Sequence, residues 1–254
     1  MQVHTPREDE VQLRLVWQHE AETPGLLAEQ RALLADEEHL KAARFRFDVH
    51  RHQYVITRAL VRTVLSAYCE VDPRAWRFGS TSYGRPYIAA PDVLPGLSFN
   101  IAHTAGLIVC ACATSRVVGV DAERVRDAPL DVANRYFSPI EVAELRALPP
   151  DAQPERFFQY WTLKESYIKA TGKGLSTPLD QFSFRLDTPG RIELFCHAGL
   201  NDDPQRWQSW LLEPAPGYLV ALTVERGPQQ IVARKVVPLH SEEPIECRVI
   251  AKSA

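Results

Sequence analysis

Apolar and polar residues alternate in several short segments of the chain, a pattern typical of β-strands with one buried face. In the first half we expect strands over 11–17, 76–78, 97–101 and 107–113. In the second half we expect strands over 117–123, 182–184, 192–195, 207–212, 218–224 and 232–236. The turn Thr114-Ser115-Arg116 separates two apolar runs, so we expect 107–113 and 117–123 to pair as a β-hairpin.

Helical periodicity marks the segments between these strands. It predicts a short helix over 26–34, an acidic helix start at 36–38 and a long helix over 50–68. A serine followed by a proline in 137–141 favours another helix start. A central helix carries Pro154 in its first turn and stops at Gly172.

The central helix places a carboxylate and an ammonium group one turn apart. Glu165 and Lys169 lie on the same side of this helix, at the edge of an apolar stripe that includes Phe157 and Ile168. One interpretation is an ordinary helix salt bridge, worth about 0.3–0.5 kcal/mol. The other interpretation is that the pair takes part in a chemical reaction, and a pair of acidic residues upstream favours this interpretation.

That second pair lies at the end of the strand over 117–123. The period of two places Asp121 and Glu123 on one face, with Ala122 opposite. Two buried neighbouring carboxylates repel each other unless one is protonated or a cation lies between them. Either the strand has reached water by Asp121, or the pair is a platform for a hard metal ion such as Mg²⁺, which prefers oxygen ligands.

Three further positions have both a structural and a functional interpretation. Arg85 stands at the tip of a tight turn with Gly84 and Pro86, and turn chemistry alone explains the latter two. His103 follows a buried strand, where a single histidine is more often structural than catalytic. Glu141 lies in the first turn of its helix, where the helix dipole favours an acid.

Composition excludes several classes of protein. The chain has 254 residues, 45% of them hydrophobic, which is enough for one large or two modest domains. Its net charge of −3 gives no sign of a protein that binds nucleic acid or a membrane surface. We expect no signal peptide and no apolar run long enough to span a bilayer. Its 5 cysteines form no CxxC pair and favour a reducing cytoplasm.

The acids and the lysine form a set that suits phosphoryl-type transfer. Mg²⁺ held by Asp121, Glu123 and Glu165 can bind both oxygens of a pyrophosphate, while Lys169 neutralises the leaving group. The sequence contains no G-x-x-x-x-G-K-[ST] loop and no G-x-G-x-x-G motif, so we expect no P-loop or Rossmann nucleotide site. It also lacks the HExxH and GxSxG motifs.

Two motifs in this order carry a family resemblance. The first is Val118-Gly119-Val120-Asp121-Ala122-Glu123, and the second is Trp161-Thr162-Leu163-Lys164-Glu165-Ser166 with Lys169-Ala170. Together they resemble the signature of the 4′-phosphopantetheinyl transferases, and their spacing is similar to the long, surfactin-synthetase-activator type. Supporting matches are Tyr83-Gly84-Arg85-Pro86, Phe99-Asn100-Ile101-Ala102-His103 and Phe137-Ser138-Pro139-Ile140-Glu141. The resemblance runs from about Phe45 to Val224.

The resemblance implies an enzyme that moves 4′-phosphopantetheine from coenzyme A to a serine of an apo acyl or peptidyl carrier protein, releasing 3′,5′-ADP. By position, Asp121, Glu123 and Glu165 would bind Mg²⁺, or Mn²⁺, which bridges the coenzyme A pyrophosphate. Glu165, directly or through a water, would help to deprotonate the serine. Lys169 would contact coenzyme A and stabilise the departing phosphate. Glu141 matches a further acidic position whose role stays open.

Other matched positions belong to the adenine and 3′-phosphate end of coenzyme A. By resemblance these are Arg51, Gly84, Arg85, Pro86 and His103, of which Arg51 matches least closely. The family often has lysine at the position of Arg85, which still supplies a cation. Ala102 replaces a frequent serine, so one hydroxyl contact to coenzyme A is in doubt.

The resemblance also implies an α+β fold with two pseudo-symmetric halves. Each half would be a helix packed on a small antiparallel sheet, with coenzyme A in the cleft between them. We expect an N-terminal half over 1–115, a C-terminal half with the metal and catalytic motifs over 116–240, and a loosely held tail over 241–254. The long type is usually a monomer, and we expect its carrier to dock beside 137–141.

Two other classes of function share part of this site. A Mg²⁺-dependent pyrophosphate hydrolase would use the same acids without docking a carrier from fatty-acid, polyketide or nonribosomal peptide biosynthesis. A silent coenzyme A or carrier-binding protein would not need the acids. The intact set of Asp121, Glu123, Glu165 and Lys169 argues against the silent binder. The match over 83–103 argues for coenzyme A over a generic pyrophosphate.

Overall fold

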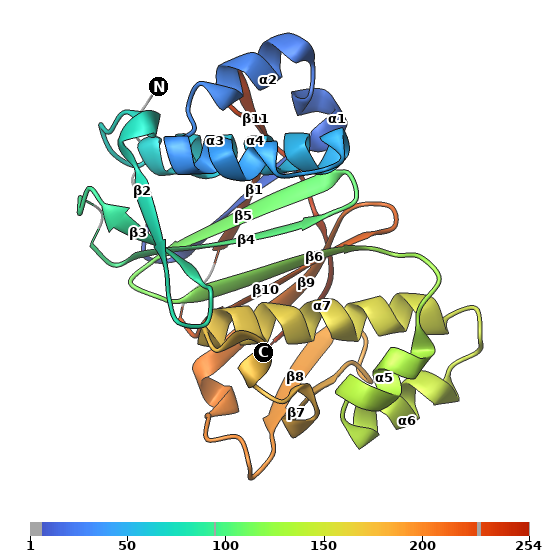
Figure 1. Cartoon of the computed structure of the whole chain (residues 1–254). Helices are drawn as coiled ribbons and strands as arrows, with labels where there is room; N and C mark the ends of the chain where they lie inside the picture. Colours follow the sequence, from blue (N-terminus) through green and yellow to red (C-terminus); the bar gives the residue numbers. More distant parts are fainter. Residues whose placement is uncertain (1–6, 94, 228–229, 254) are drawn as a thin grey trace.

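Two β-sheets lie face to face between two long helices (Figure 1). The structure is a computed structural model that describes residues 7–93, 95–227 and 230–253. Residues 1–6, 94, 228–229 and 254 lie outside the described residues; they include the beginning of the predicted N-terminal half and the last residue of the predicted tail. The layers follow in the order helix α4, first sheet, second sheet and helix α7.

The first sheet has the strand order β12-β11-β1-β5-β4. Its strands are β1 (Glu10–Trp17), β4 (Leu97–Thr104), β5 (Leu107–Thr114), β11 (Gln230–Val237) and β12 (Ser241–Pro244). Helix α4 (Asp48–Ser66) covers its outer face, where Ile56 and Leu60 pack with Ile108 and Cys110 of β5. Shorter elements beside α4 are α1 (Gln18–Ala21), α2 (Pro24–Arg31), α3 (Asp36–Ala43) and the 3₁₀ turn Pro73–Ala75.

The second sheet has the strand order β6-β10-β9-β13-β8-β7. Its strands are β6 (Val118–Arg124), β7 (Phe182–Arg185), β8 (Arg191–Cys196), β9 (Trp207–Ala215), β10 (Tyr218–Glu225) and β13 (Arg248–Ser253). Helix α7 (Gln153–Thr171) packs on its outer face against β6 and β10. Helices α5 (Leu130–Tyr136) and α6 (Pro139–Ala147) and the 3₁₀ turns Gly174–Ser176, Leu179–Gln181 and Pro204–Arg206 complete this half.

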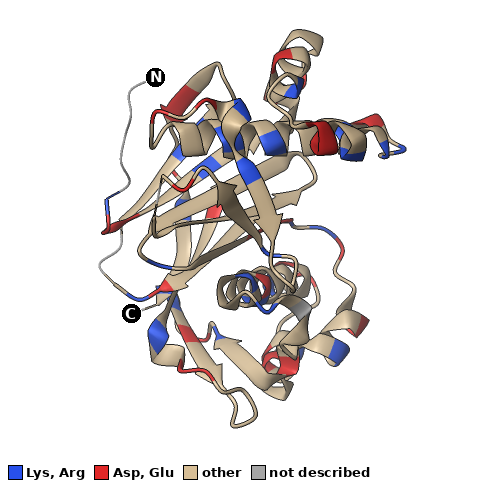
Figure 2. Ribbon diagram, turned by 60° about the vertical axis from the view of Figure 1, so that its left-hand side comes forward, with Lys and Arg blue, Asp and Glu red and all other residues tan. Residues whose placement is uncertain are grey.

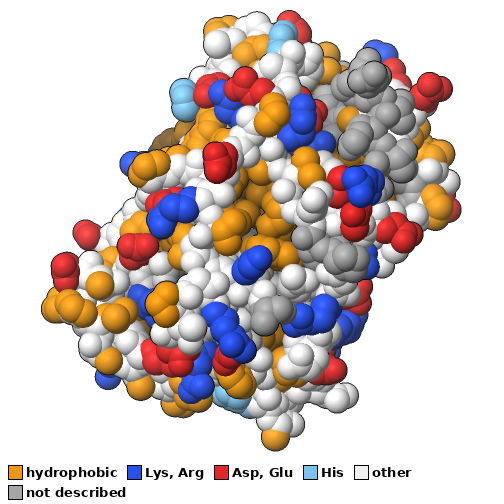
Figure 3. Space-filling view, turned by 180° about the vertical axis from the view of Figure 1, so that it is seen from behind, with side chains coloured by type: hydrophobic (Ala, Val, Ile, Leu, Met, Phe, Trp, Pro, Cys, Tyr) orange, Lys and Arg blue, Asp and Glu red, His pale blue; other side chains and the backbone are white. Residues whose placement is uncertain are grey.

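The inner faces of the two sheets form a shared apolar core. Leu13 and Val109 of the first sheet pack with Val120 and Leu222 of the second, and all four are fully buried. Because side chains alternate along a strand, the other faces are left for α4 and α7. Seen from behind, apolar side chains gather in a hollow in the middle of the molecule (Figure 3). Charged residues of both signs are spread over both halves (Figure 2).

The predicted hairpin between 107–113 and 117–123 is wrong. Strand β5 pairs with β4 on one side and with β1 on the other, so neither of its edges is free for β6. Strand β6 instead pairs with β10 in the second sheet. The chain crosses between the sheets after Ser115, whose φ of 59° turns the backbone sharply.

The C-terminal residues are held in both sheets, so the expectation of a loose tail is also wrong. Strand β12 pairs with β11, and β13 lies between β9 and β8. The buried side chain of Ala251 and an ion pair between Arg248 and Glu213 attach β13 to the second half. Strand β11 joins the first sheet, so the chain returns to the N-terminal half after it leaves the second. The division of the halves near residue 115 stays a prediction.

The α+β prediction is confirmed, with one long helix on each sheet. Most strand pairs are antiparallel, but β1–β11 and β13–β8 are parallel. Strands β2 (Arg77–Ser80) and β3 (Pro86–Ala90) form a separate two-stranded sheet. Within the described residues, no helix is both long and apolar enough to cross a membrane.

Candidate active site

Gly119 brings helix α7 unusually close to strand β6. A Cβ atom at this position would lie 2.1 Å from the carbonyl oxygen of Ser166 and 2.3 Å from the amide nitrogen of Ala170, so only glycine fits. The period of two puts Asp121 and Glu123 on the same face as Gly119, which is the face toward α7. The sequence therefore places both acids against the helix that carries Glu165 and Lys169.

Asp121 lies at the centre of this contact. Its side chain is 11% exposed, and its Oδ1 lies 2.6 Å from the ammonium nitrogen of Lys169. Its Oδ2 is buried and has no hydrogen-bond partner among the described residues. Burial raises the pKa of Asp121 to about 7, with Lys169 opposing the shift and Glu165 and Glu123 adding to it. The four predicted residues thus form one electrostatic cluster.

The other two acids have different surroundings. Burial raises the pKa of Glu165, Lys169 lowers it, and the charge of Glu123 raises it further. Glu123 accepts a hydrogen bond from Nη1 of Arg126 at 3.0 Å. Arg126 was not predicted from the sequence. Its position in a loop, three residues after Glu123, was the only indication of this contact.

The donor set fits a hard cation. Three carboxylates, among them Asp121 with its unpartnered Oδ2, supply the oxygen ligands that Mg²⁺ or Mn²⁺ prefers. In the described part of the chain, no three acidic, imidazole or thiol side chains are already gathered tightly enough to surround a metal ion. Instead, Lys169 forms an ion pair with Asp121, and Arg126 forms one with Glu123. These contacts involve one oxygen of each carboxylate, Oδ1 of Asp121 and Oε2 of Glu123, so a bound metal ion would compete with Lys169 and Arg126 for them.

His103 lies near this cluster, at the end of β4. Its pKa is lowered first by desolvation and then by the positive charges of Lys169 and His50. His50 lies in the first turn of α4, one turn before Tyr54. The sequence-predicted His103 therefore lies within the electrostatic range of both Lys169 and His50.

Arg85 lies at the C-terminal end of α7. Its Nη1 donates to the carbonyl oxygen of Ala170 at 3.0 Å, and its Nη2 donates to that of Val118 at 3.1 Å. Burial lowers the pKa of this guanidinium. It lines a pocket of about 160 Å³ whose other charged residues are Lys173, Asp202 and Arg206. The structure thus uses Arg85 to tie the β2–β3 hairpin to the second half.

The remaining predicted residues lie in local structure. Gly84 has a φ of +82°, which suits glycine in the tight turn, and Pro86 begins β3. Arg51 forms an ion pair with Asp48 and donates to the carbonyl oxygen of Phe45 at 2.8 Å. None of these contacts joins the acidic cluster.

Glu141 is fully buried and caps the start of α6, away from the cluster surface. Its carboxylate Oε2 accepts from the amide of Ser138 at 2.9 Å and lies 2.8 Å from the ammonium nitrogen of Lys164. The structural interpretation of this position as a first-turn acid is consistent with these contacts. The sequence analysis missed the role of Lys164, although a lysine within an apolar stripe was a visible signal.

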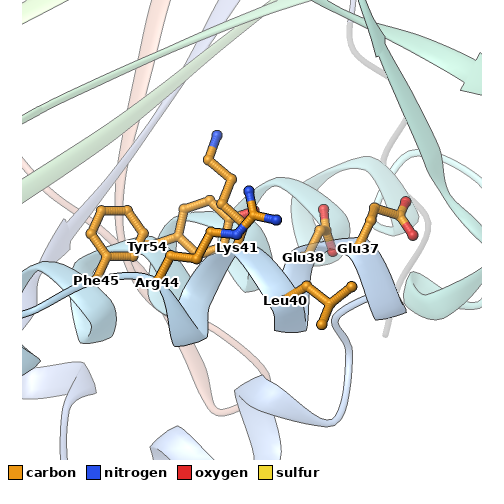
Figure 4. Close-up of a pocket in the computed structure, with 7 residues that line it drawn as sticks. All are labelled: Glu37, Glu38, Leu40, Lys41, Arg44, Phe45 and Tyr54. Atoms are coloured by element: carbon orange, nitrogen blue, oxygen red, sulfur yellow. The ribbon is translucent and has the colours of Figure 1, made fainter.

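A second hollow, of about 610 Å³, lies between α3 and the start of α4 (Figure 4). Its charged lining residues are two cations, Lys41 and Arg44, and two acids, Glu37 and Glu38. The rings of Phe45 and Tyr54, whose centroids are 5.5 Å apart, lie beside them. The ammonium nitrogen of Lys41 lies 5.4 Å from the centroid of Tyr54. The rings and cations suit an aromatic base that carries phosphate, whereas the two carboxylates oppose an anion.

Comparison with known proteins identifies the family. Residues 117–223 match the model of the 4′-phosphopantetheinyl transferase superfamily, and residues 17–115 match that of the 4′-phosphopantetheinyl transferase N-terminal region. The chain is similar to 4′-phosphopantetheinyl transferase Sfp of Bacillus subtilis (strain 168), with 36% identity over 75% of this chain and 82% of the relative. Another Bacillus subtilis 4′-phosphopantetheinyl transferase is 40% identical over 64% of this chain and 71% of its own.

A solved structure is also similar in part. The holo-[acyl-carrier-protein] synthase of Thermotoga maritima matches 43% of this chain and 62% of its own length, with 24% identity and a TM-score of 0.36. This partial likeness adds nothing to the family assignment, which rests on the two family models and on the relatives. The chain belongs to the 4′-phosphopantetheinyl transferase superfamily, as an enzyme of the long, Sfp-like type.

Proposed function

We propose that this protein transfers 4′-phosphopantetheine from coenzyme A to a serine hydroxyl of an apo acyl carrier protein or peptidyl carrier domain. The reaction is Mg²⁺-dependent and releases 3′,5′-ADP. The observation that carries this proposal is the convergence of Asp121, Glu123, Glu165 and Lys169 where β6 meets α7. The family membership gives the chemistry for which such a cluster is suited.

Asp121, Glu123 and Glu165 would hold the divalent cation, which supplies charge neutralisation for the pyrophosphate when bound. The serine oxygen of the carrier attacks the β-phosphorus of coenzyme A, and Glu165 takes the serine proton, directly or through a water. The bond from this phosphorus to the oxygen of 3′,5′-ADP breaks. Lys169 then stabilises the negative charge on the departing phosphate.

The adenine and 3′-phosphate end of coenzyme A would extend from His103 toward the start of α4. The charges of Lys169 and His50 act on His103, and His50 lies one turn before Tyr54 on α4. Tyr54 lines the hollow that contains Lys41 and Arg44 as well as two acids. Gly84, Arg85, Pro86 and Arg51 remain proposed contacts for this end, on the strength of the family motifs. A guanidinium has five N–H groups, so the two carbonyl contacts of Arg85 leave donors for a phosphate.

The carrier would dock beside α5 and α6. Ile140, within the segment 137–141, is 44% exposed, and Leu130 at the start of α5 is 40% exposed. Large apolar side chains exposed near an active site are typical of a partner surface. The five cysteines are all unpaired, which supports action in the cytoplasm. We further propose that the enzyme acts as a monomer, with no nucleic acid or membrane partner.

Intact-mass spectrometry tests the proposal. An apo acyl carrier protein and an apo peptidyl carrier domain are each incubated with the enzyme, coenzyme A and Mg²⁺, with EDTA in a control. A gain of about 340 Da on either carrier, abolished by EDTA, supports metal-assisted transfer. Cleavage of coenzyme A without a labelled carrier would indicate a hydrolase. Binding of coenzyme A with neither reaction would indicate a silent binder.

A further inference from the structure

Glu141 and Lys164 form an ion pair that is completely removed from water. Both residues have 0% relative exposure, and Oε2 of Glu141 lies 2.8 Å from Nζ of Lys164. Burial raises the pKa of Glu141 and lowers the pKa of Lys164, and the charge of each residue opposes the shift of the other. Two buried charges persist only where further hydrogen bonds satisfy them.

Each partner of this pair is held by backbone groups of several elements. Nζ of Lys164 donates to the carbonyl oxygens of Leu179 at 2.7 Å and Phe182 at 2.6 Å. With Glu141, these acceptors use all three donors of the ammonium group. Oε1 of Glu141 accepts from the amide of Phe184 at 2.8 Å, and Oε2 accepts from that of Ser138 at 2.9 Å.

The pair therefore joins three parts of the second half. Glu141 belongs to the capped first turn of α6, Lys164 belongs to α7, and Phe182 and Phe184 belong to β7. Lys164 points into this junction, while the next residue, Glu165, faces the acidic cluster. On the other side of the junction, Ile140 precedes Glu141 and is exposed.

We infer that Glu141 and Lys164 are positioning residues, which hold the carrier-docking segment at a set distance and angle from Glu165. This inference rests on the proposed function, because it assumes that a carrier docks beside Ile140. It excludes Glu141 as the catalytic base and as a metal ligand, since both of its oxygens are occupied inside the protein. The family resemblance left open whether Glu141 is a base or a metal contact. This role is therefore assigned to Glu165.

Three variants separate positioning from catalysis. Glu141→Gln and Lys164→Met each leave one buried charge without its partner, whereas the double variant removes both charges. We expect each single variant to raise KM for the carrier about tenfold, with KM for coenzyme A unchanged within about twofold. The double variant should recover carrier KM to within about threefold of the wild type, since it restores a neutral junction. Isothermal titration of coenzyme A gives a readout independent of turnover.

A control variant identifies general destabilisation. Arg14 is a buried cation that pairs with Glu242 at 2.8 Å in the first sheet. Arg14→Met should lower the melting temperature without changing KM for the carrier. If a single variant fails to fold, Glu141→Asp takes its place, because it keeps the negative charge but shortens the side chain. It should raise KM for the carrier and not KM for coenzyme A, and unchanged constants in this variant would overturn the inference.

Several outcomes would overturn the inference. A loss of kcat in Glu141→Gln that the double variant does not recover would make Glu141 a catalytic base. Wild-type constants in all three variants, or equal increases in KM for carrier and coenzyme A, would leave the pair without a positioning role. Failure of the proposed function is a separate result, because the wild-type enzyme would then label neither carrier.

Discussion

Nζ of Lys169 lies 2.6 Å from Oδ1 of Asp121, so the lysine proposed to meet the leaving phosphate is held by a proposed metal ligand. The two residues come from α7 and β6, which are far apart in sequence. A cation bound by Asp121 would repel the ammonium group and release it toward the substrate. Binding of the metal and placement of Lys169 are therefore coupled.

Lys169→Met should separate these two effects. Without the ammonium group, Asp121 is free, so the protein should bind Mn²⁺ several times more tightly in a calorimetric titration. The rate of carrier labelling should nevertheless fall about 100-fold, because the leaving phosphate loses its stabilising charge. Lys252→Met, in an exposed lysine of β13, is the matched control. Unchanged metal affinity would contradict the competition between Lys169 and the metal.

Asp121→Ala should abolish carrier labelling at ordinary Mg²⁺ concentrations. The variant removes a buried carboxylate whose Oδ2 is available as a ligand. Loss of its charge also removes the partner of Lys169. Labelling rates and Mn²⁺ titrations on the same samples check this prediction. Turnover close to that of the wild type would show that Asp121 does not hold the metal.

Arg85→Ala distinguishes two roles of this residue. If Arg85 reads the 3′-phosphate, the variant should raise KM for coenzyme A about tenfold and affect dephospho-coenzyme A less. If it acts only through the carbonyl groups of Ala170 and Val118, both substrates should be affected equally. Steady-state kinetics with the two substrates measure the difference. Arg85→Lys keeps a cation but loses the forked contact, and serves as the comparison.

The local pattern of the sequence was sufficient to find most of the site. Alternation in 117–123 placed Asp121 and Glu123 on one face, and helical periodicity placed Glu165 and Lys169 together. Both are properties of a few consecutive residues, which is why they can be inferred from sequence. That these two faces meet depends on Gly119, whose missing side chain gave no periodic signal.

Contacts between segments far apart in the sequence could not be predicted from such local patterns. An apolar run such as 107–113 shows that a strand is buried, but it does not show which strands lie beside it. The pairing of β5 with β4 and β1 was therefore missed, as was the place of β13 between β9 and β8. The ion pair of Glu141 with Lys164 was missed for the same reason, since its partners are 23 residues apart.

Glu38 should make stability depend on pH in the acidic range. Burial alone would raise its pKa, but Arg58, the amide of Ala35 and Arg62 together lower it below the ordinary value of 4.5. The unfolded state then binds the proton more readily, so this stabilising contribution is present above pH 4.5 and is lost as pH falls through the folded-state pKa. Urea unfolding of the wild type and Glu38→Gln should show a difference that shrinks below pH 4.5.

The control for this prediction is Glu37→Gln, which removes a neighbouring exposed carboxylate. It should leave the pH profile of the wild type almost unchanged. If the free energies of unfolding of the wild type and Glu38→Gln differed by a constant amount from pH 7 to pH 3, the buried ion pair of Glu38 with Arg62 would not respond to acid.

Gly119→Ala should damage both stability and activity. Its methyl group would lie 2.1 Å from the carbonyl oxygen of Ser166, which is helix backbone and cannot turn aside like a flexible side chain. Helix α7 would have to move away from β6, at a cost of about 3 kcal/mol in the free energy of unfolding. The same movement would separate Asp121 from Lys169, so labelling of the carrier should fall even where the variant is folded.

Gly25→Ala is the matched control, because no atom lies within 4 Å of an added Cβ at this position in α2. Alanine is the better helix former and should raise stability slightly, by up to about 1 kcal/mol. Urea unfolding and labelling rates of both variants give the comparison. If Gly119→Ala behaved like Gly25→Ala, the approach of α7 to β6 would not depend on a glycine, and the cluster would need another explanation for its geometry.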